Sequence, residues 1–120
     1  MIGYTTIGVK DIAKAKEFYT ALFDATVLVD IGRLAMIGKS TDAPMVAVCE
    51  PFDGNAPSCG NGSMIAFGAS SKEEVDAMHA KAISLGATTD GDPGQRIEDV
   101  FYGAYVRDPD GNKLAFFIFG

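Results

Sequence analysis

Few side chains of this sequence are suited to acid–base, nucleophilic or metal chemistry. The chain holds one histidine, His79, and two cysteines, Cys49 and Cys59. Cys49 with His79 could act as a nucleophile and its base. A cysteine on an apolar strand is, however, usually a small core residue, and no third group that would orient the histidine can be named. The cysteines match neither a disulfide scaffold nor a metal motif, so we interpret both as reduced thiols and identify no catalytic residue.

A second group of polar side chains lies in the segment Asp108-Pro109-Asp110-Gly111-Asn112. It resembles a calcium-binding loop superficially, but its glycine is misplaced and no glutamate closes the loop. Pro109 presets one backbone angle and Gly111 accepts a positive one, which favours a chain reversal. The apolar runs at residues 101–107 and 113–119 therefore predict a hairpin. Because these runs do not alternate with polar residues, we expect strands covered on both faces.

The rest of the chain predicts the elements that would position such side chains. Asp11 is suited to cap an amphipathic helix, and Ser70 or Ser71 to cap a second one that ends at Gly86. Short runs rich in β-branched residues predict strands at residues 4–9, 26–30, 34–38, 45–50 and 63–69. Residues 87–90 could form a further short strand, and residues 91–99 are expected to be a loop.

The order of these elements repeats once. Residues 4–9 match residues 64–69, and residues 35–38 match residues 104–107 at a larger spacing, which places an insertion near residues 91–99. The chain is therefore predicted to be an α+β protein of two tandem βαβββ modules. We expect a single domain over residues 1–120, with module one at residues 1–50, a linker rich in Pro, Gly and Asn at residues 51–62, and module two at residues 63–120.

Composition and charge narrow the class of partner. The formal net charge of −6 argues against nucleic acid, because binding the phosphate backbone needs a basic face. The same charge would suit a cationic ligand, or would simply keep a small protein soluble. No apolar run is long enough to span a membrane and no export signal is evident at Met1, so we expect a cytoplasmic protein without membrane contact.

Two stretches carry a family resemblance. The opening YTTIGVKDIAKAKEFYTALF and the closing FYGAYVRDPDGNKLAFF resemble the first and last motifs of the glyoxalase / bleomycin resistance / extradiol dioxygenase superfamily, the vicinal oxygen chelate fold. The resemblance covers nearly the whole chain. It implies a curled, mostly antiparallel sheet around a pocket, a homodimer, and in many members a divalent metal held by strands of both modules.

The metal positions of the superfamily are occupied here by unsuitable residues. Metal-using members typically carry His or Glu where this sequence has Tyr4, Met64, Ala115 and, in the first module, a residue near Val46. Hard metal ions need imidazole and carboxylate ligands, so we predict no metal at this place and no cofactor. The replacements that remain conceivable are Glu50, Glu98, Asp99 and His79, of which His79 is more typical of a structural, half-buried histidine.

Side chains alternate between the two faces of a strand, which predicts a ligand-binding face. Tyr4 and Thr6, Met64 and Ala66, and Ala115 and Phe117 should share the concave side of the sheet, and Glu50 and Tyr102 complete the candidate set. Tyr4 could hydrogen-bond a ligand or act as an acid, or it could fill the space of a missing metal ligand. Met64 and the phenylalanines could equally close the cavity as core.

Our leading hypothesis is a metal-free small-molecule binding protein, similar to the bleomycin resistance branch, that sequesters an apolar or aromatic ligand, with a cation permitted by the acidic charge. The alternative is a metal-dependent, glyoxalase-like lyase or dioxygenase-like oxidoreductase whose ligands have moved. A third possibility is an interaction module whose pocket is packed shut.

Overall fold

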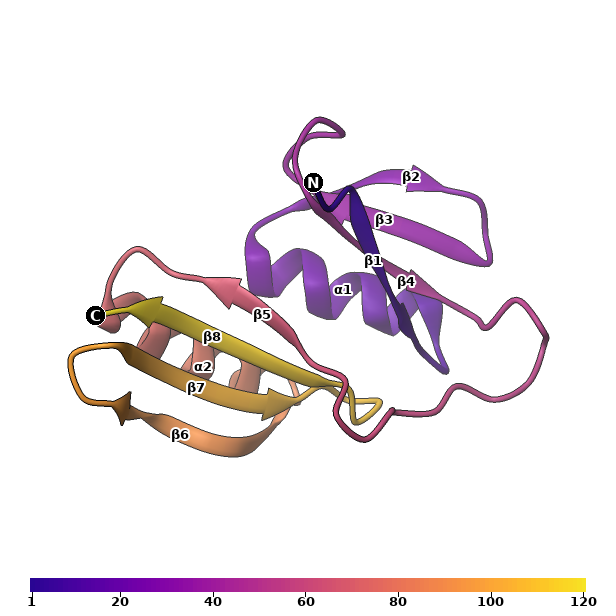
Figure 1. Cartoon of the computed structure of the whole chain (residues 1–120). Helices are drawn as coiled ribbons and strands as arrows, with labels where there is room; N and C mark the ends of the chain where they lie inside the picture. Colours follow the sequence, from indigo (N-terminus) through magenta and orange to yellow (C-terminus); the bar gives the residue numbers. More distant parts are fainter. The chain divides into compact units, whose positions relative to one another are not determined.

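The computed structural model describes all 120 residues, which form two compact units at residues 1–58 and 59–120. Each unit contains one βαβββ module, with a helix packed on one side of a four-stranded sheet (Figure 1). The first module consists of β1 (Tyr4–Gly8), α1 (Ile12–Phe23), β2 (Thr26–Asp30), β3 (Leu34–Gly38) and β4 (Met45–Cys49). The second consists of β5 (Ile65–Gly68), α2 (Lys72–Ser84), β6 (Thr88–Ile97), β7 (Phe101–Arg107) and β8 (Lys113–Phe119).

The two sheets have the same topology. Their strand orders are β1-β4-β3-β2 and β5-β8-β7-β6. In each sheet the first strand of the module pairs parallel to the last, and the other pairs are antiparallel. The predicted α+β fold with two tandem βαβββ modules is thus confirmed.

Local sequence signals explain where both helices begin and end. The Asp11 carboxylate accepts from the Lys14 amide at 3.1 Å, and Ser71 Oγ, not Ser70, accepts from the Glu74 amide at 3.0 Å. These bonds satisfy amides that a helix leaves free at its first turn. Gly86 follows α2 with φ of +109°, a conformation that favours glycine. Neither helix is long and apolar enough to cross a bilayer.

Each sheet buries one face against its own helix. In the first module the helix-side residues include Ile7, Ile37 and Val48, which are almost completely buried. In the second they include Val106, Leu114 and Phe116, on which Val75 and Ala82 of α2 pack. The opposite side of each sheet, called the helix-free face below, carries the alternate residues.

The prediction of a loop at residues 91–99 is wrong, because strand β6 continues to Ile97. This strand lies at the edge of the sheet, and its pairing with β7 shifts register three times, between Thr89/Gly91, Gly91/Gly94 and Gln95/Ile97. Edge strands tolerate proline and bulges. A Cβ at Gly91 would lie 2.8 Å from Cδ2 of Tyr105, so the Tyr105 ring packs closely on this glycine.

Candidate ligand-binding site

Strand register identifies the residues that stand at the metal positions of the superfamily. Thr6 pairs with Ala47, just as Ala66 pairs with Ala115, so the first-module counterpart of Ala115 is Ala47 and not the neighbouring Val46. Val46 lies on the helix side of its sheet. Ala47 lies next to Val46, near which the sequence analysis placed this position, and a methyl group cannot ligate a metal.

The donors available elsewhere do not converge either. No group of three His, Cys, Asp or Glu side chains lies close enough to hold a metal ion. The buried His79 has its Nε2 2.9 Å from Thr89 Oγ1, which in turn donates to the Asp92 carboxylate at 2.9 Å. These hydrogen bonds connect α2 to β6 and give the histidine a structural role. Both cysteines are free thiols. The residues present therefore do not fit a divalent-metal centre.

The helix-free face of the second sheet carries a cluster of aromatic rings. Phe101 and Phe117, from adjacent strands, stack with ring centroids 5.3 Å apart and planes only 4° from parallel. Phe119 packs edge-on against both, at 5.9 and 5.2 Å. Gly103 makes this possible, because a Cβ there would lie 2.8 Å from Cε1 of Phe101. The cluster of Phe101, Phe117 and Phe119 is an apolar platform next to the small residues Ala66 and Ala115.

Basic side chains adjoin this platform further along the same strands. The Tyr105 ring has the guanidinium of Arg96 at 5.4 Å and the ammonium of Lys113 at 5.2 Å from its centre. The Asp90 carboxylate accepts from Arg107 at 3.1 Å and lies 3.5 Å from Lys113. Asp90 thus pairs with two cations, Arg107 and Lys113, and Arg96 adds a third positive side chain over the Tyr105 ring, so this end of the face carries more positive than negative side chains.

Tyr102 lies apart from the other residues predicted to bind ligand. It alternates with Phe101 and Gly103 along β7 and so faces the helix, where its hydroxyl donates to Asp76 of α2 at 2.6 Å. This hydrogen bond, which stabilises the neutral phenol, raises the pKa of Tyr102 above its ordinary value. Tyr102 connects α2 to the sheet, and Tyr105, which the sequence analysis did not select, takes the place expected for it.

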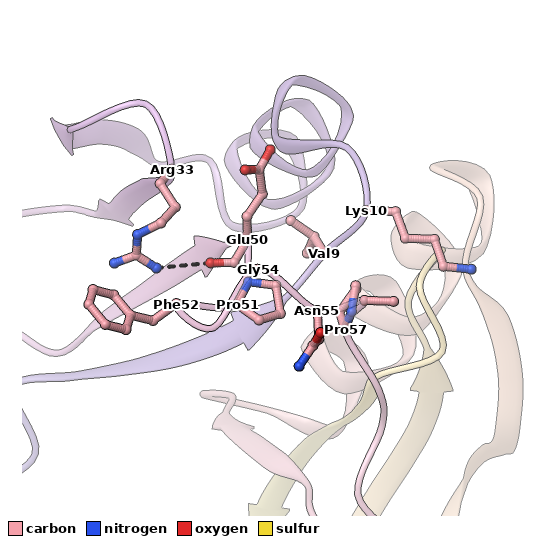
Figure 2. A pocket seen from close by; sticks show the side chains of 10 residues that line it. Val9, Lys10, Arg33, Glu50, Pro51, Phe52, Gly54, Asn55 and Pro57 are labelled. Atoms are coloured by element: carbon pink, nitrogen blue, oxygen red, sulfur yellow. Dashed lines mark hydrogen bonds between the residues drawn. The ribbon is translucent and has the colours of Figure 1, made fainter.

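The first unit holds a pocket of about 380 Å³ after the end of β4, shown in Figure 2. Arg33 Nη1 donates to the backbone oxygen of Glu50 at 2.9 Å, and the same guanidinium lies 5.3 Å from the centre of the Phe52 ring. The pocket is lined by Val9, Lys10, Arg33, Glu50, Pro51, Phe52, Gly54, Asn55, Ala56 and Pro57.

The eight predicted ligand-binding residues therefore fall into four places. Tyr4 and Thr6 share the helix-free face of the first sheet, and Tyr4 is half-exposed. Ala66, Ala115 and Phe117 share that of the second sheet, and Met64 immediately precedes β5. Glu50 lines the pocket at the opposite end of β4 from the residue paired with Tyr4, and Tyr102 faces α2.

The comparisons with known proteins agree with this architecture. The family model of the Glyoxalase/Bleomycin resistance protein/Dioxygenase superfamily matches residues 1–116. A glyoxalase/bleomycin resistance protein from Albidiferax ferrireducens T118 is 35% identical, with 98% of this chain and 97% of that chain covered and a TM-score of 0.85.

More distant structures share the fold. A glyoxalase/bleomycin resistance protein/dioxygenase family enzyme from Burkholderia phytofirmans PsJN is 20% identical over 96% of this chain and 95% of that chain, with a TM-score of 0.80. A lactoylglutathione lyase from Agrobacterium tumefaciens is 20% identical over 98% and 92%, with a TM-score of 0.73. No curated protein matches the sequence. The chain belongs to the glyoxalase/bleomycin resistance protein/dioxygenase superfamily.

Proposed function

We propose that this protein binds an apolar or aromatic small molecule without the help of a metal ion. The observation that carries the proposal is the pairing of Thr6 with Ala47 and of Ala66 with Ala115, which places methyl groups where a metal centre would need carboxylates. Tyr4 and Met64 likewise offer a phenol and a thioether in place of imidazoles. A metal-dependent lyase or dioxygenase with relocated ligands would need converging donors, and no such group is present.

The aromatic platform supports the apolar character of the ligand. Phe119 is 72% exposed, and its partners Phe101 and Phe117 are partly exposed. A stacked or edge-on aromatic pair contributes about 0.5–1.5 kcal/mol beyond its buried area, so a ligand ring placed here gains both terms.

The charge of the ligand is better judged from this face than from the whole chain. The net charge of −6 suggested a cation, but the face presents Arg96, Arg107 and Lys113 against Asp90. Because like charges in contact are unfavourable, we propose a neutral or anionic aromatic ligand instead of a cationic one.

We also propose a domain organisation, an oligomeric state and a location for the protein. A single family model spans both modules, which supports their working as one domain. We further propose a homodimer, by analogy with the superfamily, and a cytoplasmic location, which two free thiols favour because reducing compartments keep cysteines unpaired.

A ligand panel tests the proposal. The protein, stripped of metal by a chelator, is screened by thermal shift against neutral, anionic and cationic aromatic compounds, and hits are mapped by amide NMR. We expect stabilisation by neutral or anionic compounds, with signals of β7 and β8 shifted, because a ligand that binds only the folded state raises its stability. Phe117→Ala should abolish the shifts of the β7 and β8 signals, whereas Ile83→Ala, a partly exposed residue of α2, should not. Hits that bind only after metal is restored would refute the proposal.

A further inference from the structure

We propose that the pocket after β4 in the first unit is a separate binding site for a small aromatic carboxylate. Its volume of about 380 Å³ falls in the range that accommodates small ligands. In Figure 2, Arg33 and Phe52 lie together at one end of the lining and Lys10 lies at the other end. This site is independent of the aromatic platform, which belongs to the second unit.

The Arg33 guanidinium is held in place while most of its donors stay available. One nitrogen donates to the Glu50 backbone oxygen, and the Glu50 amide donates back to the Arg33 backbone oxygen, both at 2.9 Å. The Phe52 ring covers one side of the group. A guanidinium has five N–H donors in a planar fork that matches a carboxylate. Because one is bonded here and Arg33 forms no ion pair, a ligand carboxylate can be accepted without rebuilding the side chain.

The nearest carboxylate on the same hairpin does not compete for Arg33. Asp30 accepts from the Gly32 amide at 2.9 Å and from Lys16 at 3.0 Å. These two contacts, the backbone hydrogen bond first, lower the pKa of Asp30. The carboxylate is therefore committed to fixing the β2–β3 turn, and it leaves the guanidinium to the pocket.

The remaining walls suit a ring. Phe52 is 90% exposed, an unusual position for a phenylalanine, and Val9, Pro51 and Pro57 add apolar surface. The loop is anchored, because a Cβ at Gly8 would lie 2.9 Å from that of Pro57 and the Gly54 amide donates to the Pro51 oxygen at 3.0 Å. A preformed wall costs a ligand little ordering entropy.

The charges of the lining favour an anion. In Figure 2 the Lys10 ammonium points away from Arg33 and the Glu50 carboxylate points away from Phe52, so the Arg33 guanidinium supplies the charge that attracts an anion. A ring that stacks on Phe52 and carries a carboxylate beside Arg33 uses both the apolar wall and the fork of donors. The neutral analogue of such a molecule would lose the charge-assisted hydrogen bonds.

Titration of the full chain with benzoate, followed by amide NMR, tests the site. We expect saturable shifts of the amide signals of Arg33, Phe52 and Asn55. Benzyl alcohol should bind at least roughly tenfold more weakly than benzoate, because it lacks the hydrogen bonds between a carboxylate and the charged guanidinium. Arg33→Gln should weaken benzoate binding to a similar degree, whereas Lys14→Gln, on the exposed side of α1, should leave it unchanged. Phe52→Ala, a change at an exposed ring that the fold does not need, should remove the preference for benzoate over cyclohexanecarboxylate.

Two results would overturn the proposal: no shifts in these residues at saturating benzoate, or equal affinity in the Arg33→Gln protein. Arg33→Lys keeps the charge and serves as the folded reference if Arg33→Gln loses its dispersed spectrum. It should bind benzoate more weakly than the unmodified protein, because an ammonium lacks the planar fork, and equal binding would count against the geometry proposed. Phe117→Ala should not alter any of these titrations.

Discussion

Replacing Asp108 by alanine should destabilise the β7–β8 hairpin that carries the aromatic platform. Asp108 is only 4% exposed, and its carboxylate accepts from the amides of Asp110 and Asn112 at 2.9 and 2.8 Å and from the Asn112 side chain at 3.0 Å. Hydrogen bonds to a charged group contribute about 1.5–3 kcal/mol each, but donors released at a turn regain water in part. We therefore expect a loss of about 2–4 kcal/mol, less than the simple sum.

Urea unfolding followed by amide NMR measures this loss module by module, which matters because the chain consists of two compact units. Signals of β7 and β8 should lose their dispersion at lower urea in Asp108→Ala, while those of β1 and β4 change little. Asp108→Asn keeps an acceptor oxygen and should cost clearly less than the alanine variant. A loss below about 0.5 kcal/mol for Asp108→Ala, or equal losses for both variants, would refute this explanation of the turn.

Two further predictions concern β7. The hydrogen bond to Asp76 raises the pKa of Tyr102, so this bond stabilises the fold below the pKa of the unfolded phenol and is lost as pH rises through the higher folded pKa. The difference in unfolding free energy between the unmodified protein and Tyr102→Phe, measured by urea unfolding, should therefore shrink over that alkaline range. A difference independent of pH would contradict this prediction. Gly103→Ala should push the Phe101 ring away from Phe117, since a Cβ at residue 103 would lie 2.8 Å from Cε1 of Phe101. The affinity for aromatic ligands should then fall several-fold, which corresponds to about 0.5–1.5 kcal/mol. Unchanged affinity in a calorimetric titration would show that the platform does not bind them.

Much of the fold could be predicted because its signals are local. The caps at Asp11 and Ser71 act within one helical turn. The turn at Pro109 and Gly111 is equally local, because it is set by backbone conformation and by the adjacent Asp108 side chain. A short strand was predicted at residues 87–90, but its continuation to Ile97 in β6 was missed because Gly91 and Gly94 resemble loop residues. Gly91 is explained by the Tyr105 ring of β7 lying over it, a contact that no local pattern reveals.

The candidate site was predicted less well for the same reason. The apolar run at residues 101–107 hides its alternation, so Tyr102 was selected although it faces α2 and Tyr105 was passed over. The pocket depends on Pro57 packing on Gly8 and on Arg33 reaching Glu50, contacts between segments far apart in sequence. The residue types at the metal positions of the superfamily, in contrast, can be identified directly in the sequence, and the absence of a metal stays a prediction.

The most direct test of metal-free binding is calorimetric titration of the best aromatic ligand into chelator-treated protein, repeated after adding Mn²⁺, Fe²⁺, Ni²⁺ or Zn²⁺. We predict the same affinity and the same stoichiometry in every titration, since Ala47 and Ala115 offer a metal nothing to bind. Binding that requires one of these ions, or ligand turnover that appears when it is added, would contradict the proposed function.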